Sequence, residues 1–366
     1  MTDVTRIGFA GLGWAARGFH LPPLKRMGDV QIVGGYDLSD EQRRSWRSET
    51  GLDAYTSMEE LVDKTQPDLL VIATPPESHA DLCIEAVDRG LHVFCEKPFV
   101  MDLDEADRVI AAAAAADRVV TVNHEFREKP IFKAIRDGIA SERYGRLAFC
   151  QIWQLMDLAP WDEPVAWRAA MPNRTLFEGG VHLVDLLLDV YGERPLGVYA
   201  RHSSGLDESR EADAIHLVTL DFPGNRLAQI TIDRLCPAGT RYVEVRADCE
   251  RASLRASLGG RAMVQIGKKR AEKTGIRLDF GSGGLAWMEE GLKRTKLATN
   301  PREAGMHATG ALLRKNIDAI RVGDQPASSA RDARDVLAII EAAYESARRG
   351  VRVEPAYGDA KLGATL

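Results

Sequence analysis

The chain has 366 residues, more than one hydrophobic core usually supports, so its length predicts two domains. The net charge of -6 gives no electrostatic footprint for nucleic acid or for an anionic membrane, and no uninterrupted apolar run could span a bilayer. Five cysteines without Cys-x-x-Cys spacing, and an N-terminus without a signal-peptide pattern, predict a cytoplasmic protein without disulfides.

Strand and helix patterns alternate through about the first 120 residues. Strands are predicted at Arg6–Ala10, Val30–Tyr36, Leu69–Ala73, His92–Cys95 and Val119–Val122. Helices are predicted between them at about Arg17–Met27, Ser39–Thr50, Ser57–Lys64, His79–Arg89 and Leu103–Ala115. Consecutive βα units with nearly continuous apolar strands predict a parallel sheet that is covered on both faces.

A glycine motif, Gly11-x-Gly13-x-x-Ala16, lies between the first strand and the first helix. Gly11 allows a tight turn, Gly13 lets the backbone approach a pyrophosphate, and Ala16 allows close helix packing. The helix N-terminus then offers free N–H groups to phosphate oxygens. In this βαβ context the motif predicts a dinucleotide-binding Rossmann domain over residues 1–123, with Trp14 and Ala15 also at the cofactor.

The second strand ends at Asp37, where a carboxylate would bind the ribose hydroxyls of the dinucleotide. A carboxylate there also repels a 2′-phosphate, so NAD is favoured over NADP as the cofactor. Arg43 and Arg44 are expected on the solvated face of the next helix. Thr74 and Pro75 follow the third strand and are candidates to line the nicotinamide ribose.

Glu96-Lys97-Pro98 follows the strand His92–Cys95, at the sheet edge where open α/β sheets bind ligands. Partial burial there disfavours the charged form of a lysine, so Lys97 could exchange a proton with a substrate hydroxyl. Glu96 and Lys97 are therefore candidate cofactor-site residues, and Lys97 is a candidate catalytic residue. His79 is a further candidate at the cofactor, although a packing role for it is favoured.

After Asn123 the pattern changes to longer, more alternating strands separated by turn signals. A helix is predicted at Ile131–Gly138, with strands at Leu147–Gln154, Val198–His202, Ile215–Phe222, Leu227–Ile232, Tyr242–Arg246 and Ala262–Ile266. These features predict an α+β domain over residues 124–366 with one large, mostly antiparallel sheet. Ala271–Arg302 is expected to be a surface excursion, and helices at Ala308–Arg321 and Ala330–Arg349, the latter capped by Ser328 or Ser329, close the chain.

Glu178, His182 and Asp185 are spaced four and three residues apart, so one helical stretch would bring the three side chains near one another. A histidine beside a carboxylate is a general acid/base unit. Metal binding is the competing functional interpretation, disfavoured because the set has a single histidine. A helix with one buried, satisfied histidine is the structural alternative.

Several residues near this string are candidates for substrate contacts: Arg127, Trp153, Arg168, Asn173 and Asp185, together with His124 and the further tryptophans Trp161 and Trp167. Aromatic faces suit the apolar faces of sugar rings, although core packing is the more common role of a tryptophan. Either arginine could equally form a salt bridge.

Taken together, the glycine motif, Thr74-Pro75, Glu96-Lys97-Pro98 and Gly180-x-His182-x-x-Asp185 resemble the glucose–fructose oxidoreductase / inositol dehydrogenase / rhizopine catabolism (Gfo/Idh/MocA) family. The resemblance implies hydride transfer between a nicotinamide and a carbon that bears a sugar or polyol hydroxyl. It also implies a Lys–Asp–His catalytic set, which Lys97 and His182 match. Glu178 stands where the family usually has the aspartate.

Three functions remain open at this point. The first is an NAD(P)-dependent dehydrogenase or reductase of a sugar, cyclitol or derivative. The second is a redox-neutral isomerase, epimerase or glycosidase with recycled NAD, and the third is a non-catalytic nucleotide-binding protein. The resemblance further implies a homodimer or homotetramer.

Overall fold

The computed structural model describes residues 4–156, 174–205, 213–236, 241–259, 283–324, 326 and 328–358. Its first sheet has six parallel strands in the order β3-β2-β1-β4-β5-β6. Their bounds are Thr5–Ala10 (β1), Val30–Tyr36 (β2), Ala54–Tyr55 (β3), Leu69–Ile72 (β4), His92–Cys95 (β5) and Val120–Val122 (β6). This strand order defines a doubly wound, Rossmann-type sheet, as the glycine motif predicts.

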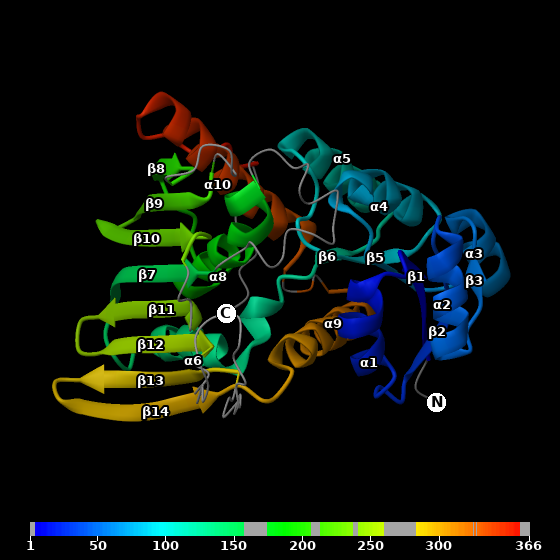
Figure 1. The fold of residues 1–366 in the computed structure, drawn as a ribbon, viewed down its shortest axis with the longest axis horizontal. Coiled ribbons are helices and arrows are strands. Elements are labelled where there is room, and N and C mark those ends of the chain that lie inside the picture. Colours follow the sequence, from blue (N-terminus) through cyan, green and yellow to red (C-terminus); the bar gives the residue numbers. More distant parts are fainter. Residues whose placement is uncertain are drawn as a thin grey trace, which may run out of the picture.

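Helices of the first half connect these strands (Figure 1). They are η1 (Ala16–His20), α1 (Leu21–Leu24), α2 (Asp40–Thr50), α3 (Met58–Thr65), η2 (Pro76–Ser78), α4 (His79–Asp88) and α5 (Leu103–Ala115). The Ser39, Ser57 and Asp102 side chains cap α2, α3 and α5 by accepting backbone N–H hydrogen bonds. The predicted elements are confirmed here to within a few residues, although η1 is π-helical and α1 ends before Met27.

One helix from the far end of the sequence completes the core of the first sheet. Helix α9 (Ala304–Val322) contributes Leu312, Leu313 and Ile317 to the apolar cluster around Ile7 and Phe9. In Figure 1 this helix lies beside α1, between the two sheets. The first sheet is therefore covered in part by residues roughly 300 positions further along the chain.

The second sheet has eight strands in the order β14-β13-β12-β11-β7-β10-β9-β8. Their bounds are Leu147–Leu155 (β7), Gly197–Ser203 (β8), Ile215–Phe222 (β9), Arg226–Asp233 (β10), Arg241–Cys249 (β11), Ser253–Gly259 (β12), Leu285–Glu290 (β13) and Lys293–Thr299 (β14). All neighbours pair antiparallel except β7 and β10, which run parallel. A large, mostly antiparallel sheet is thus confirmed.

The remaining helices are η3 (Glu125–Glu128), α6 (Pro130–Ala140), η5 (Thr175–Gly180), α8 (Val181–Tyr191) and α10 (Ala330–Arg349). Figure 1 shows α6 and α8 on the side of the large sheet that faces the first sheet. Along β9 and β10, buried residues alternate with more exposed ones, so one face packs on helices and the other is more open. Ser329 caps α10 with a capping box, whereas Ser328 hydrogen-bonds the backbone of β6.

One expectation about the second half differs from the structure. The stretch from Ala271 to Arg302 is not simply a surface excursion, because it contains strands β13 and β14. No strand was predicted at the position of β12, and the predicted strand Ala262–Ile266 lies outside the described residues.

Among the helices that the structure describes, none combines the length and apolar character needed to cross a membrane.

Candidate active site

The candidate site lies where five parallel strands of the first sheet end. Gly11 follows β1, Asp37 follows β2, Thr74 lies just beyond β4, Glu96 and Lys97 follow β5, and Asn123 and Glu125 lie just beyond β6. The carboxyl ends of parallel strands meet at one edge of a sheet, and this edge is where open α/β sheets bind ligands. The second sheet and its helices approach the same edge (Figure 1).

The glycine loop has the shape that a pyrophosphate requires. Gly11 has φ +83°, and a Cβ there would lie 2.8 Å from the Ala73 carbonyl oxygen. A Cβ on Gly13 would meet nothing within 4 Å, so the space beside its backbone is open to a ligand. Ala16 is fully buried against the sheet. The loop therefore fits a dinucleotide phosphate at the start of the helical run.

Asp37 is held in place by the backbone on both sides. Its Oδ2 accepts from Leu12 N at 2.8 Å, and its Oδ1 accepts from Ser39 N at 2.8 Å. Arg43 does not lie on a solvated helix face as expected: it is 9% exposed, donates to the Asp37 carbonyl and pairs with Asp40. One carboxylate and one guanidinium thus adjoin the predicted ribose position.

Replacing Asp37 with asparagine should weaken discrimination against NADP. The amide keeps an acceptor for Leu12 N but removes the charge that repels a 2′-phosphate, and Arg43 remains nearby. We expect the ratio of kcat/KM for NAD to that for NADP to fall by about tenfold, the equivalent of ~1.4 kcal/mol. Steady-state kinetics with both cofactors measures this ratio. Asp63→Asn, which removes an exposed carboxylate on α3, should leave it unchanged.

Other predicted cofactor residues adopt distinct surroundings. Trp14 is 74% exposed beside the glycine loop, and its ring meets Phe19 edge-on. The Thr74 hydroxyl accepts from Ser78 at 2.8 Å, and Pro75 is exposed. His79 is buried, with Nδ1 3.0 Å from the Pro98 and Phe99 carbonyl oxygens and Nε2 2.9 Å from the Thr74 carbonyl oxygen. These contacts favour the packing role of His79, whereas its role at the cofactor stays a prediction.

Glu96 anchors the segment that carries Lys97. Its Oε1 lies 2.6 Å from His20 Nε2 and accepts from Asn123 Nδ2 at 2.8 Å. Burial by itself would raise the pKa of Glu96, but these hydrogen bonds and the nearby Lys97 lower it below its usual value. An ionised Glu96 therefore ties β5 to β6 and η1 next to the candidate lysine. The following Lys97–Pro98 peptide bond is cis.

Lys97 contacts η5 across the gap between the two halves of the chain. Its Nζ donates to the Glu178 Oε1 carboxylate at 3.2 Å and to the Glu178 carbonyl at 3.2 Å. The other carboxylate oxygen of Glu178 accepts from Arg234 Nη2 at 3.3 Å. Glu178 is thus held between two cations, and two of the three predicted catalytic side chains are in contact.

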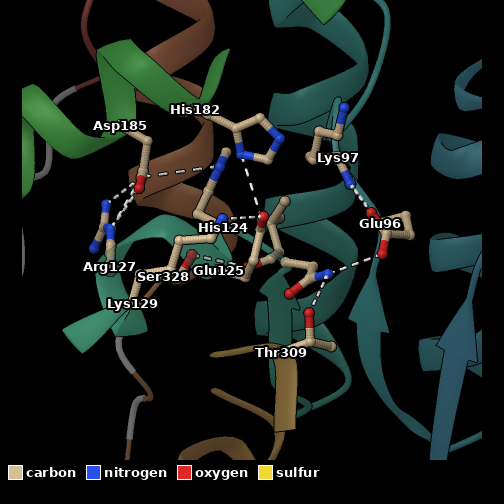
Figure 2. A network of polar contacts seen from close by, with 12 residues as sticks. Glu96, Lys97, His124, Glu125, Arg127, Lys129, His182, Asp185, Thr309 and Ser328 are labelled. Atoms are coloured by element: carbon tan, nitrogen blue, oxygen red, sulfur yellow. Dashed lines mark hydrogen bonds and ion pairs between the residues drawn. The ribbon is translucent and has the colours of Figure 1, made fainter. Parts of the chain in front are cut away.

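His182 has a different carboxylate partner from the one expected. Its Nδ1 lies 3.4 Å from Glu125 Oε2 (Figure 2). Glu178 contacts Lys97 and Arg234 instead, and Asp185 contacts Arg127. The imidazole stacks on the Phe126 ring, with centroids 4.4 Å apart. Glu125 also accepts from Lys129 Nζ at 2.9 Å. Because Nδ1 turns toward Glu125, Nε2 is the ring nitrogen left for a substrate.

Burial sets the protonation state of this pair. It lowers the pKa of His182 to about 3, with Glu125 opposing and Lys97 reinforcing the shift, so the imidazole is neutral at pH 7. Burial would raise the pKa of Glu125, but interaction with His182 and the charge and hydrogen bond of Lys129 lower it below its usual value. A neutral imidazole beside an ionised carboxylate can accept a proton, and the carboxylate then stabilises the imidazolium.

Asp185 and Arg127 engage each other instead of facing open space. Arg127 Nε donates to both carboxylate oxygens of Asp185 at 3.0 and 2.8 Å, and Nη2 donates to Oδ1 at 2.5 Å. His124 Nε2 is 4.0 Å from the same carboxylate. Asp185 is fully buried and Arg127 is 8% exposed. This buried pair braces η3 against α8, and the expected substrate contacts of both residues stay predictions.

The structure does not bring every predicted residue to this cluster. Trp153 alternates with the buried Gln154 along β7, so it lies on the opposite face of the large sheet. Arg168, Asn173, Trp161 and Trp167 lie outside the described residues. Glu125 and Arg234 were not predicted as site residues, although each follows a predicted strand. Lys97 was predicted because it follows a strand of the parallel sheet, and the same criterion would have identified Glu125.

Comparisons with known proteins agree with this geometry. Residues 5–124 match the family model described as "Oxidoreductase family, NAD-binding Rossmann fold", and residues 132–255 match the "GFO/IDH/MocA C-terminal domain". The chain belongs to the Gfo/Idh/MocA oxidoreductase family. It is accordingly an enzyme of the dehydrogenase and reductase class with a nicotinamide dinucleotide as cofactor.

The individual relatives described next are less than 30% identical to this chain in sequence. The chain is similar to a 1,5-anhydro-D-fructose reductase of Ensifer adhaerens, 29% identical over 58% of this chain and 64% of that one. It is also similar to a D-apiose dehydrogenase of Paraburkholderia graminis, 27% identical over 94% of this chain and 88% of that one. An oxidoreductase from Agrobacterium radiobacter, solved with NAD+, L-tartaric acid and magnesium, shares the fold with a TM-score of 0.81 at 18% identity, over 96% of this chain and 98% of that one.

Proposed function

We propose that the protein is an NAD-dependent oxidoreductase that interconverts a hydroxyl-bearing carbon of a sugar, cyclitol or sugar derivative with the corresponding carbonyl. The observation that carries the proposal is the contact of Lys97 with Glu178, with the neutral His182 close enough for Lys97 to influence its pKa. The two sequence relatives named above are a sugar reductase and a sugar dehydrogenase by name, and neither name supports the redox-neutral or the non-catalytic alternative.

Cofactor binding falls to the residues of the glycine loop and the strand ends. Gly11, Gly13 and Ala15 would hold the phosphates, and Asp37 the ribose, which favours NAD over NADP. When bound, the nicotinamide supplies the hydride acceptor or donor. The protein's own groups must therefore manage the proton that leaves or joins the substrate oxygen.

His182 is assigned the role of general base in the oxidation direction. Its neutral Nε2 accepts the hydroxyl proton, and the ionised Glu125 beside Nδ1 offsets the positive charge that forms on the ring. The stack on Phe126 fixes the plane of the imidazole. In the reduction direction the imidazolium returns the proton to the substrate oxygen.

Lys97 is assigned to the substrate oxygen. Its ammonium group donates a hydrogen bond to that oxygen and stabilises the negative charge that develops there. Glu178 orients the ammonium group through the contact at 3.2 Å and is itself fixed by Arg234. Glutamate is one methylene longer than the usual family aspartate, so its carboxylate can reach both cations from η5.

An assembly of two or four copies is the proposed state in solution. Tyr199, Leu217 and Leu227 are large apolar or aromatic side chains that are more than 40% exposed on β8, β9 and β10. Exposed apolar side chains on an open sheet face support contact with a second copy of the chain.

We propose a cytoplasmic location, supported by five cysteines that are all free.

A substrate screen tests the proposed function. The purified protein is incubated with NAD, and then with NADP, against neutral sugars, cyclitols and sugar acids, and NADH or NADPH formation is followed by absorbance. We expect turnover with one substrate class and a preference for NAD. Tight NAD binding with no turnover of any panel member, in either direction, would contradict the proposal.

A further inference from the structure

Two polar side chains stand side by side at the end of the parallel strand pair β7 and β10. Gln154 is paired with Ile232 in the register of these strands, and Arg234 follows directly after β10. A Cβ on Gly179 would lie 2.4 Å from Arg234 Nη2 and 3.4 Å from Gln154 Oε1. Both side chains therefore lie over η5, next to the candidate catalytic Glu178.

These two side chains have unused hydrogen-bonding groups although they are buried. The Arg234 side chain is 2% exposed. Among the described residues its partners are the Thr175 carbonyl at 3.1 Å and Glu178 Oε2 at 3.3 Å, both of which accept from Nη2. Its Nε and Nη1 have no hydrogen-bond partner in the part of the chain that the structure describes, and neither do Gln154 Oε1 and Nε2. Buried polar groups are almost always paired, so such a cluster beside a candidate active site indicates a ligand.

The charges around Glu178 favour an anionic ligand. Within the described contacts, one carboxylate is shared by two cations, Lys97 and Arg234. The nearby Lys129 is already paired with Glu125. Within the described residues, the Glu178 carboxylate engages only Nη2 of the Arg234 guanidinium, so Nε and Nη1 remain for a second anionic group. A planar guanidinium with free N–H groups matches the geometry of a carboxylate, and the amide of Gln154 can donate to the same group.

We propose that Arg234 and Gln154 form a carboxylate subsite, and that the substrate is a sugar acid. Its carboxylate binds Arg234, while a hydroxyl-bearing carbon a few bonds away faces Lys97 and His182. The Glu178 carboxylate contacts both Arg234 and Lys97, so the two cations lie close together. One small molecule could therefore place its acid group at Arg234 and its reacting carbon at Lys97. This inference rests on the proposed function and names its substrate class.

The test compares acid and neutral substrates of the same carbon skeleton. Values of kcat/KM with NAD are measured for D-galacturonate against D-galactose, D-glucuronate against D-glucose, and D-gluconate against D-glucitol. The wild-type protein should prefer the acid in at least one pair. Arg234→Gln should lower the acid-to-neutral ratio in that pair by about 10²-fold. Arg234→Lys, which keeps the charge but loses the planar fork, should lower it less.

Matched variants separate recognition from folding and positioning. Arg246→Gln makes the same change on β11, where Arg246 pairs with Asp248, and should leave the ratio unchanged. Gln154→Met, an apolar change of similar size, tests the subsite without touching the guanidinium. An Arg234→Gln variant that loses acid and neutral turnover in equal proportion would assign Arg234 only to the positioning of Glu178, and would overturn the inference while leaving the proposed function intact.

A binding measurement keeps the inference testable if no panel sugar is turned over. Each acid and its neutral partner are titrated into the complex of the protein with NADH, and the fluorescence of the bound NADH is recorded. Tighter binding of the acid that is lost in Arg234→Gln supports the subsite, even where the proposed reaction fails. Equal binding of acid and neutral sugar, or acid binding that survives the substitution, overturns it.

Discussion

Replacing Lys97 with methionine is expected to lower kcat by about 10²–10⁴-fold, the range that a positioned proton-transfer or charge-stabilising group contributes. Methionine keeps much of the aliphatic length of the side chain but removes the ammonium group that contacts Glu178. Arg234 still holds the other oxygen of Glu178, so the carboxylate is not left without a cation. The loss should therefore appear in turnover and not in folding.

Two measurements distinguish a catalytic lysine from a cofactor anchor. The dissociation constant of NAD, from titration calorimetry, should change by less than about threefold in Lys97→Met, while single-turnover rates fall with kcat. Lys133→Met provides the matched control, because Lys133 is exposed on α6. If NAD affinity and turnover fall together by the same factor, Lys97 is an anchor for the cofactor and the assignment of its chemical role is wrong.

Arg127→Met should destabilise the protein by about 3–5 kcal/mol, because it leaves the buried Asp185 carboxylate without its bidentate partner. Arg127 also lies 3.9 Å from Asp332 at the start of α10, so the substitution loosens three elements at once. The free energy of unfolding from urea titration measures the loss. Arg89→Met, which breaks an exposed pair with Glu85 on α4, should cost less than about 1 kcal/mol.

The decrease in the free energy of unfolding caused by Arg127→Met should become smaller as the pH falls. Burial raises the pKa of Asp185 to about 6 even with Arg127 pulling it down. Without the arginine, the folded-state pKa lies higher still, so folding of the variant favours the protonated acid. Between about pH 8 and pH 5, stability relative to wild type should recover as the pH falls. A loss that stays constant over this range would show that it does not arise from the Asp185 charge.

The parallel sheet could be predicted from sequence because its strands are short, continuous apolar runs with a turn residue after each. The strand β14 escaped prediction because its sequence Lys293–Thr299 is dominated by charged residues, which suit an edge strand but mask its periodicity. The strand β13 was hidden for another reason, since Leu285–Glu290 contains several good helix formers. Pairing with β12 overrides that local preference.

The candidate site likewise contains residues that could be predicted from sequence and contacts that could not. Gly11, Asp37 and Lys97 could be found because each follows a strand, and the carboxyl ends of parallel strands meet. The pairing of His182 with Glu125 and of Glu178 with Arg234 could not be predicted, because the position of a residue after a strand does not show which side chain of another element it contacts. Helical spacing correctly placed Glu178, His182 and Asp185 in one stretch, but Glu178 turns toward Lys97 and Arg234, whereas His182 and Asp185 both turn toward η3.

The position of α9 bears on how the chain acquires its structure during synthesis. Leu312, Leu313 and Ile317 fill the cluster that contains Ile7, Phe9 and Leu12, and Ser328 hydrogen-bonds the backbone of β6 at Val122. A nascent chain that has emerged only as far as residue 123 therefore holds an apolar surface that nothing in its own sequence can cover. The final packing of the nucleotide-binding half therefore uses residues from the last quarter of the chain, which couples the folding of the first sheet to the synthesis of α9.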